Sequence, residues 1–179
     1  MGLNLSEHPQ EAALGECGRD RVGALYTQHA VGLIRAAMLL VGDQASAEDV
    51  VQDAFLGLYR VWADLRDHDK AIRYLRVAVL NGSRSVLRGR RRARLIGALQ
   101  HDPPVWSAES AAMAREDMRE VLAAVARLPR RQREVLVCKY YLDLPEQEIA
   151  TTLRISRGTV ASTKSRALAA LIADLQEEK

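Results

Sequence analysis

The stretch Leu128–Leu171, LPRRQREVLVCKYYLDLPEQEIATTLRISRGTVASTKSRALAAL, decides the fold of the second half of this chain. It contains two short helical patterns in quick succession, over 146–153 and 157–171, in which apolar residues recur three and four positions apart. The apolar residues are Ile149, Ala150 and Leu153 in the first pattern, and Val160, Ala167, Leu168 and Leu171 in the second. Two helices joined by a very short connection are therefore predicted.

The connection Arg154-Ile155-Ser156 favours a sharp angle between these helices. Ser156 suits the N-cap of the second helix, because its hydroxyl can accept a hydrogen bond from the amide near Thr159. Ile155 supplies an apolar contact in the turn, and Ala150 lets the helices cross closely. These features indicate a helix-turn-helix, whose second helix can enter a DNA major groove. A helical hairpin without DNA would share half of them.

The outward face of the second helix carries short or cationic side chains. With Val160 turned inward, a rotation of about 100° per residue places five residues outward. They are Gly158, Thr159, Ser162, Ser165 and Arg166. A glycine within a helix costs about 1 kcal/mol relative to alanine, which close approach to a phosphate would explain. The alternative is a solvated polar face with an incidental glycine.

Composition favours helices throughout. The chain has 179 residues, of which 48% are hydrophobic and 4% aromatic, enough for one or two small helical cores. The two cysteines, Cys17 and Cys138, have no metal-ligand spacing and predict inert thiols in a reduced, cytoplasmic setting. We identify no signal peptide and no apolar run of membrane-spanning length. No cofactor, no metal and no membrane partner are expected.

The first half of the chain predicts three helices. Residues 1–20 read as a loose tail, and the first helix is expected from Arg21 to the helix-ending Gly42. Ser46 is predicted to cap the second helix, with Asp49 completing a capping box. Its expected apolar side is Val51, Ala54, Phe55, Leu58, Trp62 and Leu65, and its polar side is Glu48, Asp49, Gln52, Asp53 and Arg60. No nucleophile, histidine or metal triad accompanies these acids, so a solvated or partner-binding face is expected rather than catalysis.

The third predicted helix, from about Lys70 to Arg92, is strongly basic. No acid lies between Arg73 and Arg94, so the arginines would repel one another unless an anion such as nucleic-acid phosphate neutralised them. The arginines are Arg73, Arg76, Arg84, Arg88, Arg90, Arg91, Arg92 and Arg94, and Ile72, Leu75, Val79, Ser83 and Val86 form the expected buried side. Tyr74 and Asn81 could stack on, or bond to, an unpaired base. Alternatively, Tyr74 belongs to the core and Asn81 is a satisfied polar residue.

A linker separates this region from the second domain. Asp67-His68-Asp69 reads as a polar loop before the third helix, and helical periodicity is lost from Ala93 to about Arg115, where adjacent prolines break helices. The predicted architecture is all-α, with two small helical domains joined by a flexible linker. Its divisions are a tail at 1–20, a first domain at 21–92, a linker at 93–115 and a second domain at 116–179.

Three motifs together resemble a known family over nearly the whole predicted fold. AEDVVQDAFLGLYRVW at Ala47–Trp62, YLRVAVLNGSRSVLRGRRR from Tyr74, and LPRRQREVLV with EQEIATTLRISRGTVAS are similar to domains 2 and 4 of a bacterial RNA polymerase sigma factor of the sigma-70 family. The short linker resembles the compact extracytoplasmic-function (ECF) type, and its SigE-like actinobacterial branch in particular. The resemblance implies a subunit without catalytic activity that directs promoter-specific transcription initiation.

The resemblance also implies partners and residue roles. The partners would be promoter DNA and core RNA polymerase, through the clamp helices of its largest subunit and the flap of its second-largest subunit, with an anti-sigma factor as a further candidate. The implied polymerase-binding residues are Asp49, Gln52, Asp53, Leu56 and Arg60. The implied −10 DNA-binding residues are Arg73, Tyr74, Arg76, Asn81, Arg84 and Arg88. The implied −35 DNA-binding residues are Arg157, Gly158, Thr159, Ser162, Lys164, Ser165 and Arg166.

Three residues depart from the family pattern. Pro145 stands where a serine cap is common, so the first helix of the motif is expected to begin with a proline and to be poorly capped. Arg154 replaces a small turn residue, and Lys164 replaces an inward leucine and is expected to reach outward to a phosphate. From a different functional class, a free-standing helix-turn-helix repressor remains as the alternative function.

Overall fold

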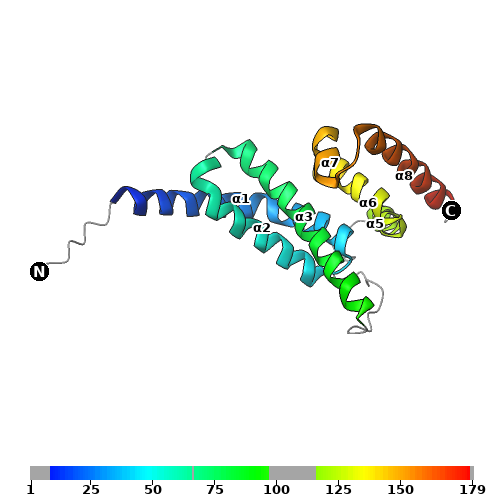
Figure 1. Ribbon diagram of the computed structural model, residues 1–179, viewed down its shortest axis with the longest axis horizontal. Helices are drawn as coiled ribbons and strands as arrows, with labels where there is room; N and C mark the ends of the chain where they lie inside the picture. The colour runs from blue at the N-terminus through cyan, green and yellow to red at the C-terminus, as the bar shows by residue number, and fades with distance from the viewer. Residues whose placement is uncertain (1–8, 66, 97–115, 178–179) are drawn as a thin grey trace, which may run out of the picture.

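The chain forms two groups of helices (Figure 1). The structure is a computed structural model and describes residues 9–65, 67–96 and 116–177. In order, the helices are α1 (Pro9–Val41), α2 (Gln44–Leu65), α3 (His68–Leu95), α5 (Glu116–Arg127), α6 (Arg130–Leu136), the π-helix η1 (Val137–Tyr141), α7 (Glu146–Leu153) and α8 (Arg157–Glu177). No strand occurs among the described residues, in agreement with the predicted all-α class.

Helix α1 begins earlier than the sequence analysis predicted. It starts at Pro9 rather than Arg21, so the prediction of a loose tail up to Asp20 is wrong over 9–20. Proline is favoured in the first helical turn, and the following QEAAL is rich in strong helix formers. Residues 1–8 lie outside the described residues. The predicted end is confirmed: α1 stops at Val41, and Gly42 adopts a φ of 88°, which favours glycine.

The prediction that Ser46 caps α2 is wrong. The helix begins at Gln44, and the Ser46 amide donates to the Asp43 carboxylate at 2.9 Å. Asp43 therefore does the capping that the sequence analysis assigned to Ser46, because the aspartate precedes the first turn and can reach its unpaired amides. The predicted apolar side of α2 is confirmed, with Val51, Ala54, Phe55 and Leu58 all buried.

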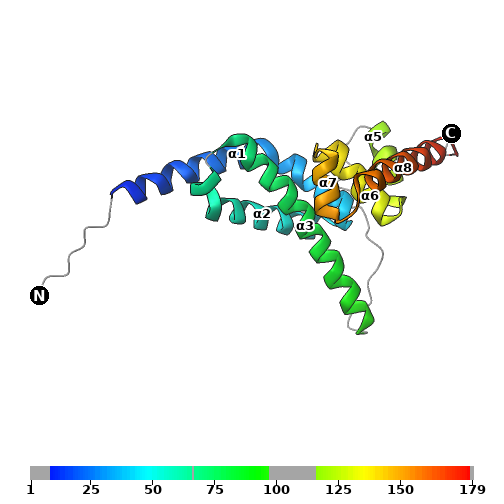
Figure 2. The ribbon, with the colours of Figure 1, turned by 45° about the horizontal axis from the view of Figure 1, so that its top comes forward.

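Asp67 starts α3. Its carboxylate accepts from the Asp69 amide at 3.0 Å, so the predicted polar loop is only a cap, and the helix runs from His68 to Leu95. The first residues of the predicted linker at 93–115 therefore belong to α3, which ends at Leu95. Residues 97–115 lie outside the described residues. Figure 2 shows the last turns of α3 extending away from α1 and α2, and its terminal Leu95 is 79% exposed.

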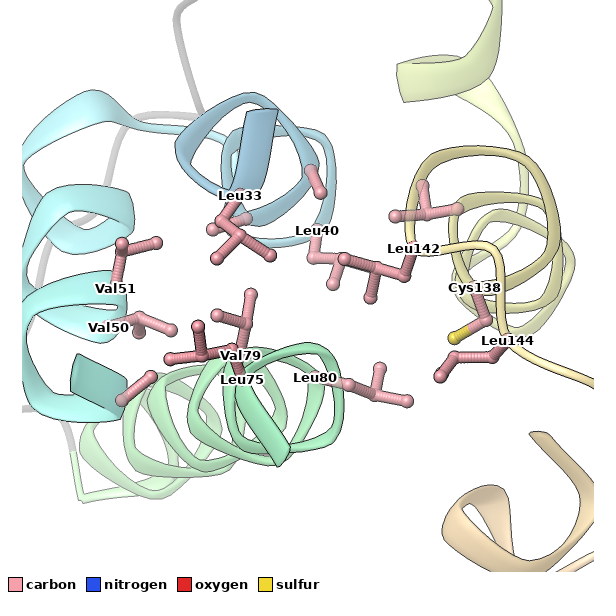
Figure 3. Close-up of a cluster of buried hydrophobic side chains, with 14 of the residues drawn as sticks. Leu33, Leu40, Val50, Val51, Leu75, Val79, Leu80, Cys138, Leu142 and Leu144 are labelled. Carbon is pink, nitrogen blue, oxygen red and sulfur yellow. The ribbon is translucent and has the colours of Figure 1, made fainter. Parts of the chain in front are cut away.

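One apolar cluster joins the two groups of helices. In Figure 3, Leu40 on α1 and Leu80 on α3 face Cys138, Leu142 and Leu144 of the second group. These five side chains are all buried and belong to the same core cluster as the interior of α1, α2 and α3. The two predicted domains therefore pack against each other through apolar surface, and this contact brings α3 close to the helix-turn-helix.

The segment Gly18–Val41 of α1 has the length and mean hydropathy of a membrane-spanning helix, 24 residues at 1.3. No apolar segment of this length was predicted from the sequence. Half of the most apolar window is buried inside the protein, where Ala36, Ala37 and Leu39 are covered by α2 and α3. Its apolar character is accounted for by the three-helix core.

Candidate nucleic-acid interface

The helix-turn-helix forms through α7, a tight turn and α8. Arg154 adopts the left-handed conformation, with φ 55° and ψ 52°, and the Ile155 amide returns to the Ala150 carbonyl at 3.0 Å. This is an αL helix termination, which usually uses glycine or asparagine. Ser156 accepts from the Thr159 amide at 3.0 Å, which confirms the predicted N-cap. The turn thus fixes the direction in which α8 leaves α7.

The start of α7 follows the prediction of poor capping, but the prediction that the helix begins with Pro145 is wrong, because its first residue is Glu146. Pro145 occupies the N-cap position, one residue before the helix, and makes no side-chain hydrogen bond to it. Its carbonyl accepts instead from the amides of Glu148 and Ile149, at 2.9 and 3.0 Å. Glu146 and Glu148 lie in the first turn, where negative charge is favoured by the helix dipole. Backbone bonds and acidic side chains therefore replace the missing serine.

Helix α8 has one buried and one exposed face. Val160, Thr163 and Ala167 are buried, and Thr163 is a buried polar residue that the sequence analysis did not identify. The five residues predicted to face outward are all exposed: Gly158, Thr159, Ser162, Ser165 and Arg166. Arg157, which the family resemblance adds to the −35 residues, is exposed as well. A side chain at Gly158 would meet only the Ser156 hydroxyl, at 3.8 Å, so packing within the chain does not require glycine there.

Lys164 lies between these two faces. Its ammonium pairs with the Glu146 carboxylate on α7. The hydrogen bond between them raises the pKa of Lys164 and lowers the pKa of Glu146. Lys164 therefore holds α8 to α7 in the free chain, whereas the sequence analysis expected it to reach a phosphate.

Three arginines of the basic helix α3 pair with acids of the second domain. Arg73 contacts Glu148, and the Arg76 guanidinium lies 3.9 Å from the Asp143 carboxylate. The Arg84 Nε lies 3.6 Å from Glu134, an ion-pair distance rather than a hydrogen bond. Three of the six −10 residues predicted from sequence thus face acids of the second domain.

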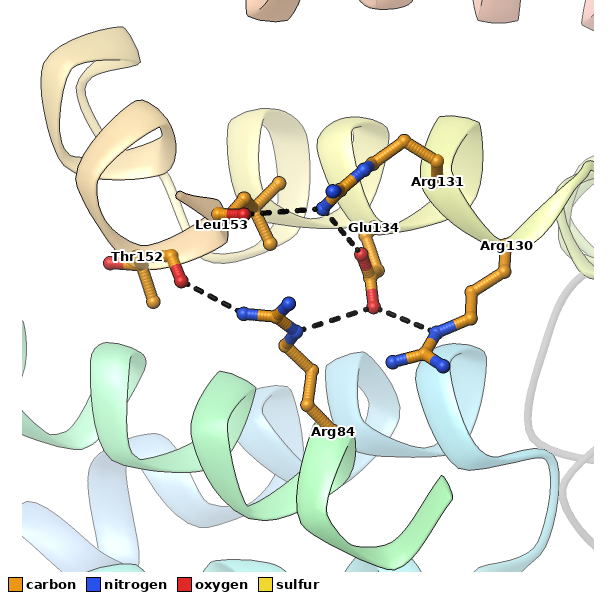
Figure 4. A network of polar contacts seen from close by, with 6 residues as sticks. All are labelled: Arg84, Arg130, Arg131, Glu134, Thr152 and Leu153. Carbon is orange, nitrogen blue, oxygen red and sulfur yellow. Dashed lines mark hydrogen bonds and ion pairs between the residues drawn. The ribbon is translucent and has the colours of Figure 1, made fainter. Parts of the chain in front are cut away.

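Glu134 is the centre of this contact (Figure 4). Its side chain is 3% exposed, and it also accepts from Arg130 at 3.0 Å and Arg131 at 3.4 Å. Arg84 Nη1 donates to the Thr152 carbonyl at 2.8 Å, near the carboxyl end of α7. Glu134 was not among the site residues predicted from sequence, although an acid directly before three buried apolar residues was a signal that it could be buried.

Tyr74 and Asn81 lie in different cavities. Asn81 lines a cavity of about 620 Å³ with Arg84 and Arg88 of α3, facing Thr151, Thr152 and Arg154 across it. Tyr74 lines a cavity of about 390 Å³ between α2 and α3, and its hydroxyl lies so close to Gly57 that a side chain there would approach it to 2.6 Å. The structure therefore does not bring Tyr74 and Asn81 into one pocket.

A stripe along α2 is exposed opposite the core. It contains the predicted polymerase-binding residues Asp49, Gln52, Asp53, Leu56 and Arg60. Leu56 is 56% exposed, and the neighbouring Tyr59, which the sequence analysis did not select, is 42% exposed. Large apolar side chains surrounded by charges are typical of a protein-binding surface.

Comparisons with known proteins identify both groups of helices. Residues 25–93 match the family model "Sigma-70 region 2", and residues 118–171 match "Sigma-70, region 4". The ECF RNA polymerase sigma factor SigL of Mycobacterium tuberculosis (strain ATCC 25618 / H37Rv) is 34% identical over 159 residues, covering 86% of this chain and 88% of that protein. The chain belongs to the ECF RNA polymerase sigma factors. This ECF sigma factor is also 32% identical to the RNA polymerase sigma-E factor of Streptomyces coelicolor (strain ATCC BAA-471 / A3(2) / M145) over 143 residues, covering 80% of this chain and 79% of that one.

Solved structures agree with this assignment. CnrH in complex with the cytosolic domain of CnrY has a TM-score of 0.62 and 28% identity, covering 94% of this chain and 96% of that chain. The sigma factor RpoE from Bartonella quintana, in complex with the anti-sigma factor NepR, has the same fold, with a TM-score of 0.61, 19% identity, and coverage of 87% and 99%.

Membership in this family decides between the two functions considered from the sequence. The ECF sigma factor directs RNA polymerase to promoters, and the alternative of a free-standing repressor is wrong. A repressor would need only the helix-turn-helix, whereas the match to region 2 covers all of α2 and nearly all of the basic run in α3.

Proposed function

We propose that this ECF sigma factor works through three surfaces: the exposed stripe of α2 binds core polymerase, the basic face of α3 melts and holds the −10 element, and the outer face of α8 reads the −35 element. The observation that carries the proposal is that α8 has one exposed face and one buried face. The short and cationic side chains are exposed, whereas Val160, Thr163 and Ala167 are buried against the rest of the domain. A helix with this arrangement can enter a major groove without disturbing its own packing.

The α2 stripe would bind the clamp helices of the largest subunit. Leu56 would be the apolar centre of the contact, and Asp49, Asp53 and Arg60 would supply charges around it. Replacing Leu56 with aspartate should abolish binding of the chain to core polymerase, measured by its competition with a second sigma factor. The substitution should not unfold the chain, because this side chain is already mostly in solvent. Val31→Asp is a matched control on α1, since Val31 is 55% exposed.

On α3, the arginines would hold phosphates of the non-template strand and Asn81 would bond a base that leaves the stack. Unstacking a base costs a few kcal/mol, so direct contacts must offset it. Tyr74 and Asn81 were both predicted to contact an unpaired base. Because the two residues line separate cavities, they would act at different nucleotides.

The test is transcription with core polymerase on a library of genomic templates, with the start sites sequenced. Wild type should convert the core enzyme into a promoter-specific one. Asn81→Ala should reduce promoter opening, measured by permanganate reactivity, more than closed-complex formation. Arg166→Ala should weaken the −35 footprint, whereas Arg21→Ala removes an exposed arginine of α1 and should change neither. Core binding without selective initiation by wild type would contradict the proposed function.

The partner set proposed from the sequence includes an anti-sigma factor. The solved structure of RpoE with NepR supports this class of partner, because it is a sigma factor of the same fold in complex with one. Co-purification of the tagged chain from cells, with and without core polymerase, would identify such a protein.

A further inference from the structure

Arg154 ends α7 in a backbone conformation that suits glycine better than arginine. Its φ of 55° and ψ of 52° bring the Cβ of an L-residue too close to the following carbonyl oxygen. The turn needs this conformation, because the Ile155 amide must return to the Ala150 carbonyl. It does not need the guanidinium, which makes no hydrogen bond or ion pair with any residue that the structure describes. A strained residue whose side chain serves no contact within the fold points to a role in binding.

Arg154 lines a cavity of about 620 Å³ between the turn and α3. Asn81, Arg84 and Arg88 of α3 line it from the other domain, and the remaining lining residues are Val77, Thr151 and Thr152. None of the described residues that line it is acidic. Guanidinium groups only donate hydrogen bonds and are always charged. Three arginines around one polar cavity therefore favour an anionic ligand.

This cavity coincides with a gap in the row of ion pairs along α3. Arg73, Arg76 and Arg84 each lie beside an acid of the second domain. Arg88, one turn beyond Arg84, has no such acid within the described part of the chain, and it shares the cavity with Arg154 instead. Two arginines from different domains thus lie on one cavity without a carboxylate to neutralise them. Their repulsion would be relieved by a bound anion.

Arg84 is held in place beside the cavity. Its Nη1 donates to the Thr152 carbonyl at 2.8 Å, and its Nε lies 3.6 Å from the Glu134 carboxylate (Figure 4). Arg88 and Arg154, by contrast, are exposed. The cavity therefore combines one fixed guanidinium with two free ones, and the free ones reach it from opposite domains.

The size and polarity of the cavity indicate the class of ligand. Its volume lies within the range of small-molecule sites and exceeds what a single inorganic phosphate would fill. Because Arg88 and Arg154 belong to different elements, a ligand with two or more phosphate groups could engage both. The Asn81 amide both donates and accepts hydrogen bonds, and Val77 adds an apolar contact, which suits a nucleoside.

From these observations we propose that the cavity binds a nucleoside di- or triphosphate, whose phosphates pair with Arg88 and Arg154 and whose nucleoside lies beside Asn81 and Val77. The nucleotide site itself does not depend on the proposed function. Its consequence does: if Asn81 and Arg88 also bind the −10 element, nucleotide and DNA compete for them, and the nucleotide concentration regulates promoter binding.

The test is isothermal titration calorimetry of the full-length free chain with GDP, ADP and inorganic pyrophosphate at about 50 mM salt, where screening is weak. We expect one molecule of each to bind per chain, and guanosine and adenosine not to bind. Arg154→Gly and Arg88→Ala should each weaken binding about tenfold or more, through the loss of charge-assisted hydrogen bonds. Arg154→Gly should keep the wild-type circular dichroism spectrum, because glycine suits the left-handed turn.

Arg92→Ala is the matched control, because it removes an exposed arginine of α3 that does not line the cavity. It should keep the wild-type affinity for all three probes. Equal weakening by Arg92→Ala and Arg154→Gly would mean diffuse attraction to a basic chain and would overturn the site. Failure of wild type to bind any probe saturably would overturn it as well. A loss in only one of the Arg88 and Arg154 variants would overturn binding between the domains.

Transcription with core polymerase separates this site from the proposed function. The Arg154→Gly holoenzyme should initiate at the same promoters and give the same −35 footprint as wild type, because Arg154 is not among the residues proposed to bind DNA. A lost footprint with unchanged nucleotide affinity would assign Arg154 to DNA and overturn the nucleotide site. Unselective initiation by wild type would refute the proposed function and leave the calorimetry as it stands.

Discussion

Arg90 on α3 binds Asp43, the residue that caps α2. Its guanidinium also donates to the Val41 carbonyl and to the Ser46 hydroxyl, each at 2.7 Å, and its side chain is only 14% exposed. One arginine of the basic run thus ties the end of α1, the start of α2 and the end of α3 together. Its role is in the fold rather than in ligand binding.

Arg90→Ala should lower the free energy of unfolding by about 2 kcal/mol, because several partly buried acceptors lose their donor. Urea denaturation followed by circular dichroism at neutral pH measures this change. Arg92→Ala, which truncates an exposed arginine in the last turn of α3, should stay within about 0.5 kcal/mol of wild type. Equal effects of the two substitutions would mean that the Arg90 contacts contribute no stability.

The same site predicts a pH dependence of stability. Burial raises the pKa of Asp43, but the hydrogen bonds from the Ser46 amide and from Arg90 outweigh burial, so the pKa lies below its ordinary 3.8. A carboxyl with a lowered folded-state pKa stabilises the fold above the unfolded-state pKa, and this contribution is lost as pH falls through the folded-state value. Urea titrations between about pH 6 and pH 3 should therefore show a shallower loss of stability in Asp43→Asn than in wild type. Asp53→Asn, an exposed acid of α2, should retain the wild-type slope.

The Cys138 thiol should be inert in the folded protein. Burial raises its pKa to about 12, with a further increase from Glu134 and an opposing effect of Arg84. Against the ordinary value of 9.0, this means about a thousandfold less thiolate at mildly alkaline pH. In a Cys17→Ser background, alkylation by iodoacetamide should therefore be slower by about that factor in buffer than in urea. Comparable rates would show that the surrounding core opens readily.

Ser156→Ala should cost about 1 kcal/mol of stability and weaken the −35 footprint, because the Thr159 amide loses its acceptor at the start of α8. Ser156→Asn should restore both properties. Ser156→Asp should restore stability alone, since it caps the helix but places a negative charge near DNA phosphate. A stable Ser156→Ala variant would indicate that packing alone holds the turn.

The sequence by itself determined the helices and the motif that they build. Val160 had to be inward because the apolar spacing of its helix leaves only one apolar side, and Ser156 had to cap α8 because the unpaired amides of a helix start need an acceptor. These are local requirements, satisfied by residues within one or two turns of each other. The buried side of α2 and the end of α1 at Gly42 were predictable for the same reason.

Only the tertiary structure decided what each charged residue binds. In the sequence Arg84 and Arg90 are two members of one basic run, yet Arg84 lies beside Glu134 and Arg90 beside Asp43, residues 50 and 47 positions away. Lys164 likewise pairs with Glu146 on α7, although its position in the sequence predicted that it would reach outward to a phosphate. A charge acts over several ångströms on whatever the fold brings near, and that proximity depends on how whole helices pack through side chains such as Leu80 and Leu142. Helical periodicity records which side of a helix is buried, but it holds no information about which distant acid will lie opposite.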